Sequence, residues 1–255
     1  MSSPKFKYNS NLAKGSGLVN ETLALIEFYE LGESKAEFML RCIAQNVLNK
    51  STEHRTKDII NLVFFDRYWK TNENAVNHLK LLRENGLSLN SIKSLLFIYT
   101  ARANQVLFDF VLELRREKHT KKITKDTSKN FLLRAISDGN APAWSDSMIS
   151  HIASYLISCL NDFGLLDNDG FLKVTLPDSK VCSFFLHELH FKGFGDDKIL
   201  QDEIWELMGL DVHQLLKEIE RISFKGTFIF QFSGEILKIG WLFKNMEEFV
   251  DYECR

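Results

Sequence analysis

Apolar positions recur every three or four residues along most of the chain, the spacing that places them on one face of an α-helix. Residues 95–99 are apolar nearly all round, which predicts a helix buried on all sides. The pattern therefore predicts a mainly α fold. The expected helices cover residues 20–31, 34–48, 51–64, 72–85, 91–102, 106–119, 124–139, 145–163, 179–192, 198–208 and 212–222.

Several of these helices begin at residues whose side chains cap free backbone N–H groups. Ser34 with Glu37 three residues later is a capping box. Asn20 and Thr124 stand before apolar runs and are expected to be N-cap residues, and either Ser145 or Asp146 is expected to cap the helix that follows the turn at 141–144.

Strand patterns are short and confined to the later part of the chain. Residues 227–232 and 236–243 are expected to form a β-hairpin that turns at Ser233 and Gly234. The phenylalanines that alternate along its first strand point to one face and are expected in a core.

A second, smaller hairpin is expected from Leu165–Leu166, the turn at 167–170 and the extended run at 171–176. After helices at 124–139 and 145–163, this is the order of a winged helix-turn-helix, with 145–163 in the place of the recognition helix. An incidental hairpin in a helical domain is the alternative interpretation.

The elements predict four parts. These are a polar, extended arm at residues 1–19, an N-terminal helical domain at 20–123, a winged-helix-like segment at 124–176, and an acidic C-terminal helical segment with a β-hairpin at 177–255. With 45% hydrophobic residues and three prolines, the chain can bury a core in this helical arrangement.

Charge is distributed unevenly along the chain. Residues 1–134 hold 22 Lys+Arg against 14 Asp+Glu, whereas residues 135–255 hold 10 against 20, although the whole chain has a net charge of only −2. This asymmetry suggests that the first half binds a polyanion. A surface that is lopsided without any such partner is the alternative.

Basic residues are densest between 115 and 134, and a second basic region lies between residues 5 and 57. The helix at 145–163 has no Lys or Arg, so it would contact DNA through Ser, His or water, which favours shape or backbone contact over base readout. The candidate DNA-binding residues are Lys5, Lys7, Lys14, Arg41, Lys50, Arg55, Lys57, Arg115, Arg116, Lys118, Lys121, Lys122, Lys125, Lys129, Ser147 and His151.

Motifs that would indicate catalysis are absent from the sequence. It has no P-loop, GxGxxG, HExxH or GxSxG motif and no acidic metal cluster. His187 and His190 lack zinc-site spacing and a third ligand, so positions on a helix surface explain them more simply. We expect no enzyme activity, no cofactor and no metal.

The four cysteines lie far apart without a CxxC pair, which is typical of reduced thiols in the cytoplasm. Residues 1–14 are polar, so no signal peptide is expected. No apolar stretch approaches the roughly 20 residues that a membrane-spanning helix requires. We therefore expect a cytoplasmic protein without membrane insertion.

Short strings at the joints between the expected helices carry a family resemblance. They are Asn9–Gly15, Glu21–Thr22, Leu31–Ser34, Asn46–Lys50 followed by Arg55, Ala101–Arg102, Trp144–Ser145 and Asp162–Leu166. In these strings the sequence resembles the BrxA family, the small helical component of BREX bacteriophage-defence systems. The resemblance covers most of residues 8–176, is weaker beyond, and defines no DNA-contact motif.

The resemblance implies a cytosolic, nearly all-helical protein with a NusB-like fold, which binds double-stranded DNA beside other BREX components and has no enzyme activity. The leading hypothesis is a non-catalytic DNA-binding accessory protein that binds mainly through backbone electrostatics. One alternative is an assembly adaptor that docks other defence proteins through its acidic C-terminal half. An RNA-binding protein is a further alternative.

Overall fold

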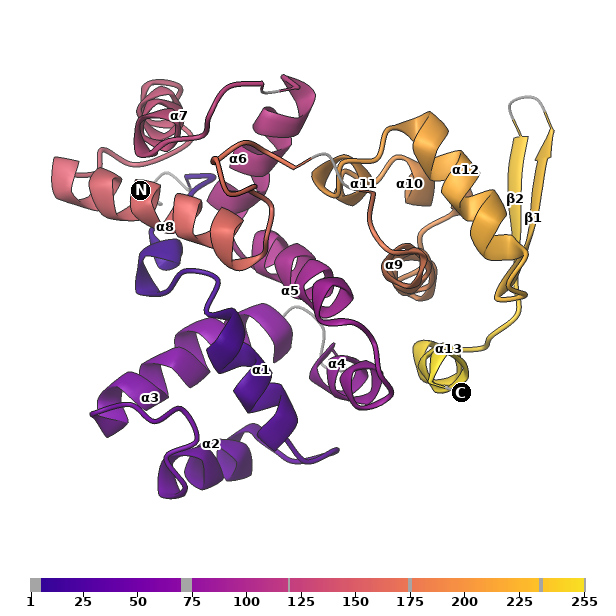
Figure 1. The fold of residues 1–255 in the computed structure, drawn as a ribbon, viewed down its shortest axis with the longest axis horizontal. Helices are drawn as coiled ribbons and strands as arrows, with labels where there is room; N and C mark the ends of the chain where they lie inside the picture. The colour runs from indigo at the N-terminus through magenta and orange to yellow at the C-terminus, as the bar shows by residue number, and fades with distance from the viewer. Residues whose placement is uncertain (1–5, 70–74, 119, 174–175, 234–235, 255) are drawn as a thin grey trace, which may run out of the picture. The chain divides into compact units, whose positions relative to one another are not determined.

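The computed structural model describes residues 6–69, 75–118, 120–173, 176–233 and 236–254. Lys5, one of the candidate DNA contacts, lies outside the described residues. The fold is mainly helical, with a small antiparallel hairpin near the C-terminus, as the sequence pattern predicted (Figure 1).

The elements of the chain as far as residue 173 are all helical. They are the 3-10 helix η1 (Asn11–Lys14), α1 (Val19–Phe28), α2 (Lys35–Ala44), α3 (Glu53–Ile59), the π-helix η2 (Ile60–Trp69), α4 (Ala75–Glu84), α5 (Leu89–Ala103), α6 (Gln105–Arg116), α7 (Lys125–Ser137) and α8 (Asp146–Asp162).

The later part of the chain adds shorter helices and the hairpin. Its elements are α9 (Ser179–Phe191), α10 (Asp196–Leu200), α11 (Ile204–Leu207), α12 (Val212–Ser223), β1 (Phe228–Ser233), β2 (Ile236–Trp241) and α13 (Met246–Glu253). β1 and β2 are antiparallel in a register that pairs Phe228 with Trp241 and Ser233 with Ile236.

Helix starts that depend on local capping are confirmed. The Ser34 hydroxyl accepts from the backbone N–H of Glu37, and the Glu37 carboxylate accepts from the N–H of Ser34. Thr124 and Ser145 cap α7 and α8 in the predicted positions. These caps involve residues three apart, so the sequence contains all that they need.

Other boundaries differ from the predictions. Asn20 does not cap α1, because the preceding Leu18 takes the N-cap position in a left-handed conformation. The helix expected at 198–208 is divided into the short helices α10 and α11. Helix α13 was not predicted. The hairpin strand expected at 171–176 is reduced to an isolated bridge between Leu166 and Leu172, with residues 174–175 outside the described part.

The N-terminal segment is also more ordered than the extended arm that was expected. Its residues 11–14 form η1, and Tyr8 and Leu12 are buried. The Tyr8 hydroxyl donates to Asp109 on α6 at 2.6 Å, and its backbone N–H donates to Asn140 at 2.9 Å. Buried aromatic and aliphatic side chains therefore attach this segment to the helical core.

The chain divides into two compact units, the first formed by Met1–Lys80 and Leu96–Lys173, the second by Leu81–Leu95 and Val174–Arg255. In the first unit, α6 buries seven apolar residues and forms part of the core. Helix α7, seen nearly end-on in Figure 1, crosses α8, and a short turn joins them. Their contact includes a 3.1 Å hydrogen bond from the Ser128 hydroxyl to the Ala153 carbonyl.

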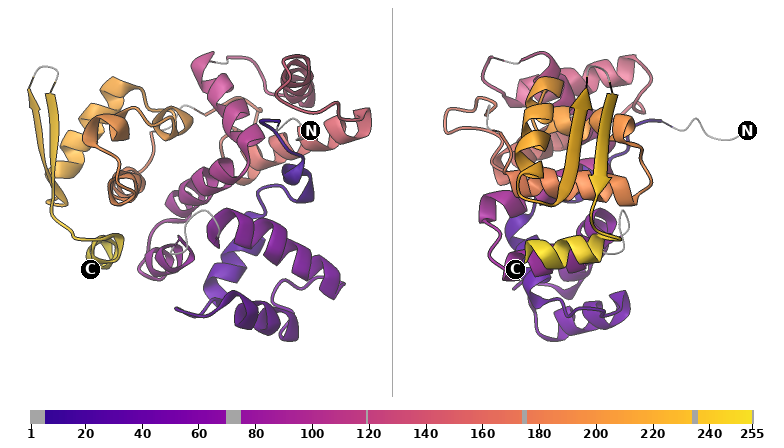
Figure 2. Two further views of the ribbon diagram at one scale, coloured as in Figure 1. Left: turned by 180° about the vertical axis from the view of Figure 1, so that it is seen from behind. Right: turned by 90° about the vertical axis from the view of Figure 1, so that its right-hand side faces the viewer.

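The second unit is organised around α9, which is buried at Ser179 and throughout Val181–Leu189. Helices α10, α12 and α13 pack against it. The hairpin forms a two-stranded ribbon that contacts α10 and α12 (Figure 2). Asp196, at the start of α10, accepts a 2.9 Å hydrogen bond from the backbone N–H of Ile239 on β2.

His187 lies inside this core, so the predicted position on a helix surface is wrong for it. Its ring stacks on Phe249 with centroids 3.8 Å apart, and its Nδ1 lies 2.8 Å from the Ser183 carbonyl oxygen. Burial lowers the pKa of His187 to about 4, because the charged imidazolium is poorly solvated among aromatic rings. The ring is therefore neutral at physiological pH.

Among the described residues, no single helix has the length and apolar character to cross a membrane. Helices α5 and α6 meet that test only as a pair, across a bend of 115°.

Candidate nucleic-acid interface

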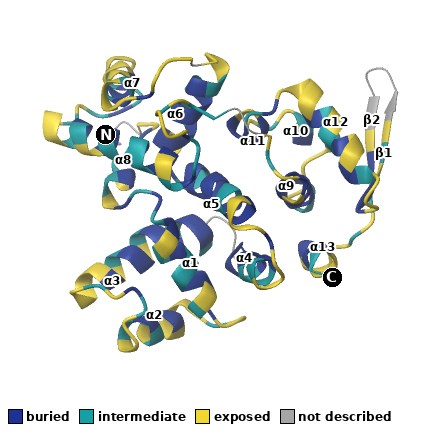
Figure 3. Ribbon diagram, viewed as in Figure 1, coloured by how far each residue is buried: buried dark blue, intermediate teal, exposed yellow. Residues whose placement is uncertain are grey.

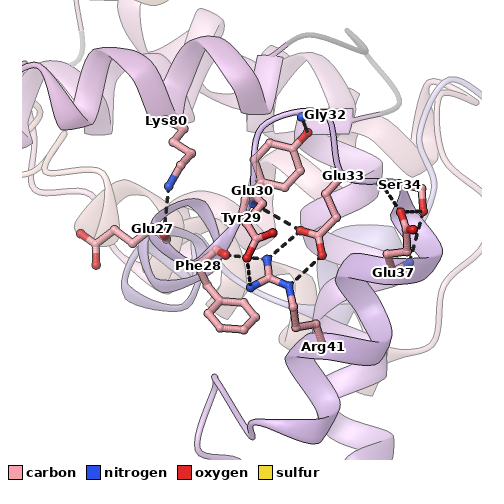
Figure 4. A network of polar contacts seen from close by, with 10 residues as sticks. All are labelled: Glu27, Phe28, Tyr29, Glu30, Gly32, Glu33, Ser34, Glu37, Arg41 and Lys80. Atoms are coloured by element: carbon pink, nitrogen blue, oxygen red, sulfur yellow. Dashed lines mark hydrogen bonds and ion pairs between the residues drawn. The ribbon is translucent and has the colours of Figure 1, made fainter.

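Arg41, a candidate DNA contact on α2, is enclosed by protein acceptors (Figure 4). Its guanidinium donates to both Glu33 carboxylate oxygens at 2.8 and 2.7 Å and to the Phe28 carbonyl at 2.8 Å, and it pairs with Glu30 at 3.0 Å. The hydrogen bonds from Arg41 lower the pKa of Glu33. Arg41 therefore neutralises the charges of Glu30 and Glu33 and caps the Phe28 carbonyl at the C-terminus of α1, which is a structural role.

Three more cations of the N-terminal region have carboxylate partners. Lys50 pairs with Glu21 at 2.9 Å, Lys57 with Glu53 at 2.7 Å, and Lys7 with Asp109 at 2.5 Å. Lys14 and Arg55 are exposed, and the Arg55 guanidinium lies 3.5 Å from the Lys14 carbonyl oxygen. Much of the positive charge in this region is thus already balanced within the protein.

Arg67 on η2 is a buried arginine whose role the sequence analysis missed. It donates to the carbonyls of Gly15 and Ser16, each at 2.7 Å, and to that of Gly17 at 3.2 Å. It therefore fixes the glycine-containing loop that leads into α1. The neighbouring apolar residues of this helix were a usable signal, because an arginine among them needs internal acceptors.

The basic segment, defined here as residues 118–129, joins α6 to α7 and includes the first turn of α7. Lys118, Lys121, Lys122 and Lys125 are exposed, and Lys129 is half-buried. None of these five lysines has an ion pair within the described part of the chain. Figure 3 shows exposed positions along α7. Their charges remain available to an external anion.

The segment begins at a strained backbone position. Lys118 follows the end of α6 with φ at 46°, in the left-handed region that residues other than glycine rarely adopt. Such a conformation costs roughly 1 kcal/mol or more for a residue with a Cβ. It also ends the helix, since the Lys118 N–H donates to the Arg115 carbonyl and closes a four-residue turn.

Two predicted contacts beside the segment differ in their surroundings. Arg116 is exposed. Arg115 is half-buried, and its Nη1 donates to the carbonyl of Lys173 at 2.6 Å. Burial lowers the pKa of Arg115, because its charge loses hydration.

The turn at 167–173, which follows α8, lies directly against the basic segment. The backbone N–H of Ile123 donates to the Gly170 carbonyl at 2.9 Å. A Cβ added at Gly170 would lie 3.2 Å from Cε of Lys122 and 3.3 Å from its Cγ, so the lysine stem crosses this glycine. The fold therefore brings together residues about 50 positions apart.

Ser147 and His151 are exposed one turn apart on α8. The contact between Ser128 and Ala153 sets the start of α7 against the middle of α8. Within the described residues, neither Ser147 nor His151 has a recorded hydrogen bond to a lysine of the basic segment. The two predicted sets thus lie on neighbouring elements, the lysines on α7 and the chain before it and the polar pair on α8, and no recorded hydrogen bond joins them.

The described residues contain no group of three or more His, Cys, Asp or Glu side chains placed to hold a metal ion. What this region presents to solvent is a set of cations, with Lys125 and Lys129 on α7 and Lys118, Lys121 and Lys122 on the chain before it.

Comparison with protein families finds a match to the BrxA family model over residues 6–186. This range contains all the elements of the first unit and ends within α9. A comparison with curated proteins gives no match.

Proposed function

Because the chain belongs to the BrxA family and is thus a BREX-associated protein, we propose that it binds double-stranded DNA without catalysing a reaction on it. The observation that carries this proposal is the basic segment, whose five lysines lie within 12 residues and have no carboxylate partner in the described part of the chain. Phosphates of a duplex are regularly spaced anions that such a segment can neutralise.

The first turn of α7 supports the same function. The positive end of its dipole favours an anion close to Lys125, although the Thr124 cap and the Asp126 carboxylate already satisfy part of this helix end. Lysines on the preceding loop would then contact neighbouring phosphates along one strand. Because these contacts involve the DNA backbone, binding is expected to depend only weakly on sequence.

Helix α8 adds shape recognition more readily than base readout. Its exposed Ser147 and His151 offer hydrogen-bonding groups, and the helix has no arginine or lysine to read guanine edges. We therefore expect α8 to contact the duplex through its polar face and through water.

The direct test is titration of the full chain with short duplexes of unrelated sequence at several salt concentrations, followed by fluorescence anisotropy. Release of counterions from four or five phosphates predicts that log K falls with log salt with a slope of about −4. Similar affinities for all duplexes are expected. A flat salt response, or no binding at about 50 mM salt, would contradict the proposal.

Structured RNA is the matched competitor in this titration. Duplex DNA and the A-form helix of RNA differ in groove shape and in the 2′-hydroxyl. A DNA-binding protein should therefore bind duplex DNA more tightly than an RNA helix with the same number of phosphates. Displacement of DNA by a lower concentration of RNA would instead favour RNA binding.

A role as an assembly adaptor is a second candidate, and it rests on the second unit. This part of the chain is acidic and extends beyond the family match, and it exposes large apolar side chains, including Phe224 (83% exposed) and Val212 (57%). Exposed apolar residues are typical of protein contacts when they are contiguous. Loss of co-migration with purified BREX components in Phe224→Ser, but not in Lys121→Gln, would favour this function.

A further inference from the structure

The turn at 167–173 is connected to the basic segment at two positions, and this connection suggests how the proposed DNA site keeps its shape. We infer that Arg115 is a positioning residue, which joins the turn to the basic segment so that its lysines keep a fixed arrangement beside α8. This inference rests on the proposed DNA-binding function. It assigns Arg115 a role different from the phosphate contact that its sequence position suggested.

Arg115, on α6, contacts the turn at 167–173 through its guanidinium. Its Nη1 donates to the Lys173 carbonyl at 2.6 Å, and its Nε is buried with no hydrogen-bond partner in the described part. Because Nε is buried, an external phosphate could reach only the Nη groups, and a phosphate that drew Nη1 off the Lys173 carbonyl would leave a partly buried acceptor without a donor, at a cost of about 1–3 kcal/mol. Arg115 is therefore better placed to hold the turn than to contact DNA.

The second connection lies at the other end of the loop. Ile123 is buried, and its N–H donates to the Gly170 carbonyl at 2.9 Å. Gly170 has φ at 87°, which favours glycine, and its missing side chain leaves room for the Lys122 stem. The loop between Arg115 and Ile123 is consequently attached to the turn on both sides.

The turn itself is rigid enough to serve as a support. Asp167 accepts hydrogen bonds from the backbone N–H groups of Asp169 and Phe171 at 3.0 and 2.8 Å. The Lys173 N–H donates to Leu165 at 2.8 Å, immediately after the end of α8. Through this turn, the position of the loop is set by α8.

The mechanical consequence concerns the lysines. Without the connections, Lys118, Lys121 and Lys122 would lie on a free loop, and ordering them on a duplex would cost conformational entropy at binding. With the connections, this entropy is lost during folding, so more of the electrostatic attraction contributes to affinity.

Arg115→Met tests the inference, because it removes the hydrogen bond and the charge but keeps an unbranched stem. The matched control is Arg134→Met, which removes one arginine that pairs with Glu113 near the same helix. In Arg115→Met, amide hydrogen exchange at 120–123 and 167–173 should become faster. Duplex affinity should fall about tenfold, and the slope of log K against log salt should decrease by more than the value of about 0.9 that corresponds to one phosphate contact. Arg134→Met should leave both nearly unchanged.

Two further variants keep the test decisive if Arg115→Met folds poorly. Arg115→Lys retains a donor and should restore most of the slow exchange and of the affinity. Gly170→Ala strains the left-handed turn and crowds Lys122. It should therefore weaken DNA binding by disturbing the contact between Gly170 and Ile123, without any change at Arg115. Circular dichroism verifies that each variant remains folded.

Unchanged exchange in Arg115→Met, together with a salt slope reduced by a single contact, would overturn the inference and make Arg115 a phosphate ligand. Faster exchange with unaltered affinity would overturn it too. If the unmodified protein binds no duplex, the proposed function fails, and the exchange rates in Arg115→Met still show separately whether this arginine holds the turn.

Discussion

The N-terminal cations and the basic segment contribute to the same positive half of the sequence, but they differ in what they contact. Arg41, Lys50 and Lys57 have carboxylate partners within 3.0 Å. The lysines of the basic segment have none within the described residues. Net charge along a sequence therefore overestimates the charge that a protein offers to a ligand, because part of it is neutralised when the chain folds.

The largest expected effect on DNA affinity comes from removing charge in the basic segment. Lys118, Lys121, Lys122 and Lys125 replaced together by Gln should lower duplex affinity about 100-fold or more at moderate salt, by loss of several phosphate contacts. The matched quadruple variant, with Lys7, Lys50, Arg55 and Lys57 replaced by Gln, should retain most of the affinity. Anisotropy titrations measure both, and equal losses would remove the distinction between the two regions.

Arg41 provides the opposite test, because its loss should affect folding rather than binding. Arg41→Gln leaves Glu33 and the Phe28 carbonyl without their charged donor and should lower the free energy of unfolding by about 2 kcal/mol. Lys57→Gln, which removes an exposed pair on one helix, should cost less than about 0.5 kcal/mol. Urea unfolding gives both values. Loss of DNA affinity in folded Arg41→Gln would assign Arg41 to the binding surface.

A substitution at Lys118 should change both DNA affinity and the free energy of unfolding. Lys118→Gly relieves the left-handed strain and should raise the free energy of unfolding by up to about 1 kcal/mol, although it removes a lysine from the basic segment. Duplex affinity should fall a few-fold, by the loss of one contact. Higher affinity in this variant would show that the lysine charge does not contribute to binding.

The smallest effect is a pH dependence confined to the N-terminal region. Arg41 lowers the pKa of Glu33 below its unfolded value of about 4.3, so this pair stabilises the fold above that pH and its contribution is lost as the pH falls through the lower, folded value. Stability should therefore decrease less steeply between about pH 5 and pH 3 in Arg41→Gln than in the unmodified protein. Parallel curves would show that the pair contributes nothing.

The sequence predicted features that depend on near neighbours. The capping box of Ser34 and Glu37 and the caps at Thr124 and Ser145 were found because each involves residues three positions apart. The hairpin of β1 and β2 was likewise visible in its alternating residues. For the candidate site, the sequence located the dense lysines but not which of them are free of carboxylates.

Long-range partners explain what the sequence did not reveal. Arg115 bonds the Lys173 carbonyl 58 positions away, and no local pattern distinguishes it from the exposed Arg116. His187 is enclosed by rings from β1 and α13, and the second of these elements is a short acidic helix that was not predicted. A signal was present in the apolar residues that surround His187, Phe184–Leu186 before it and Leu189 after it, which favour a buried helix.

The burial of α9 has a practical consequence for shortening the protein. The family match ends at residue 186, inside a helix whose residues Val181–Leu189 are all buried. A chain cut at that point would lose the rest of α9 together with α12 and α13, and would present Phe184 and Phe185 to water. Such a fragment is expected to aggregate, so the boundary of sequence similarity is a poor guide to where this chain can be divided.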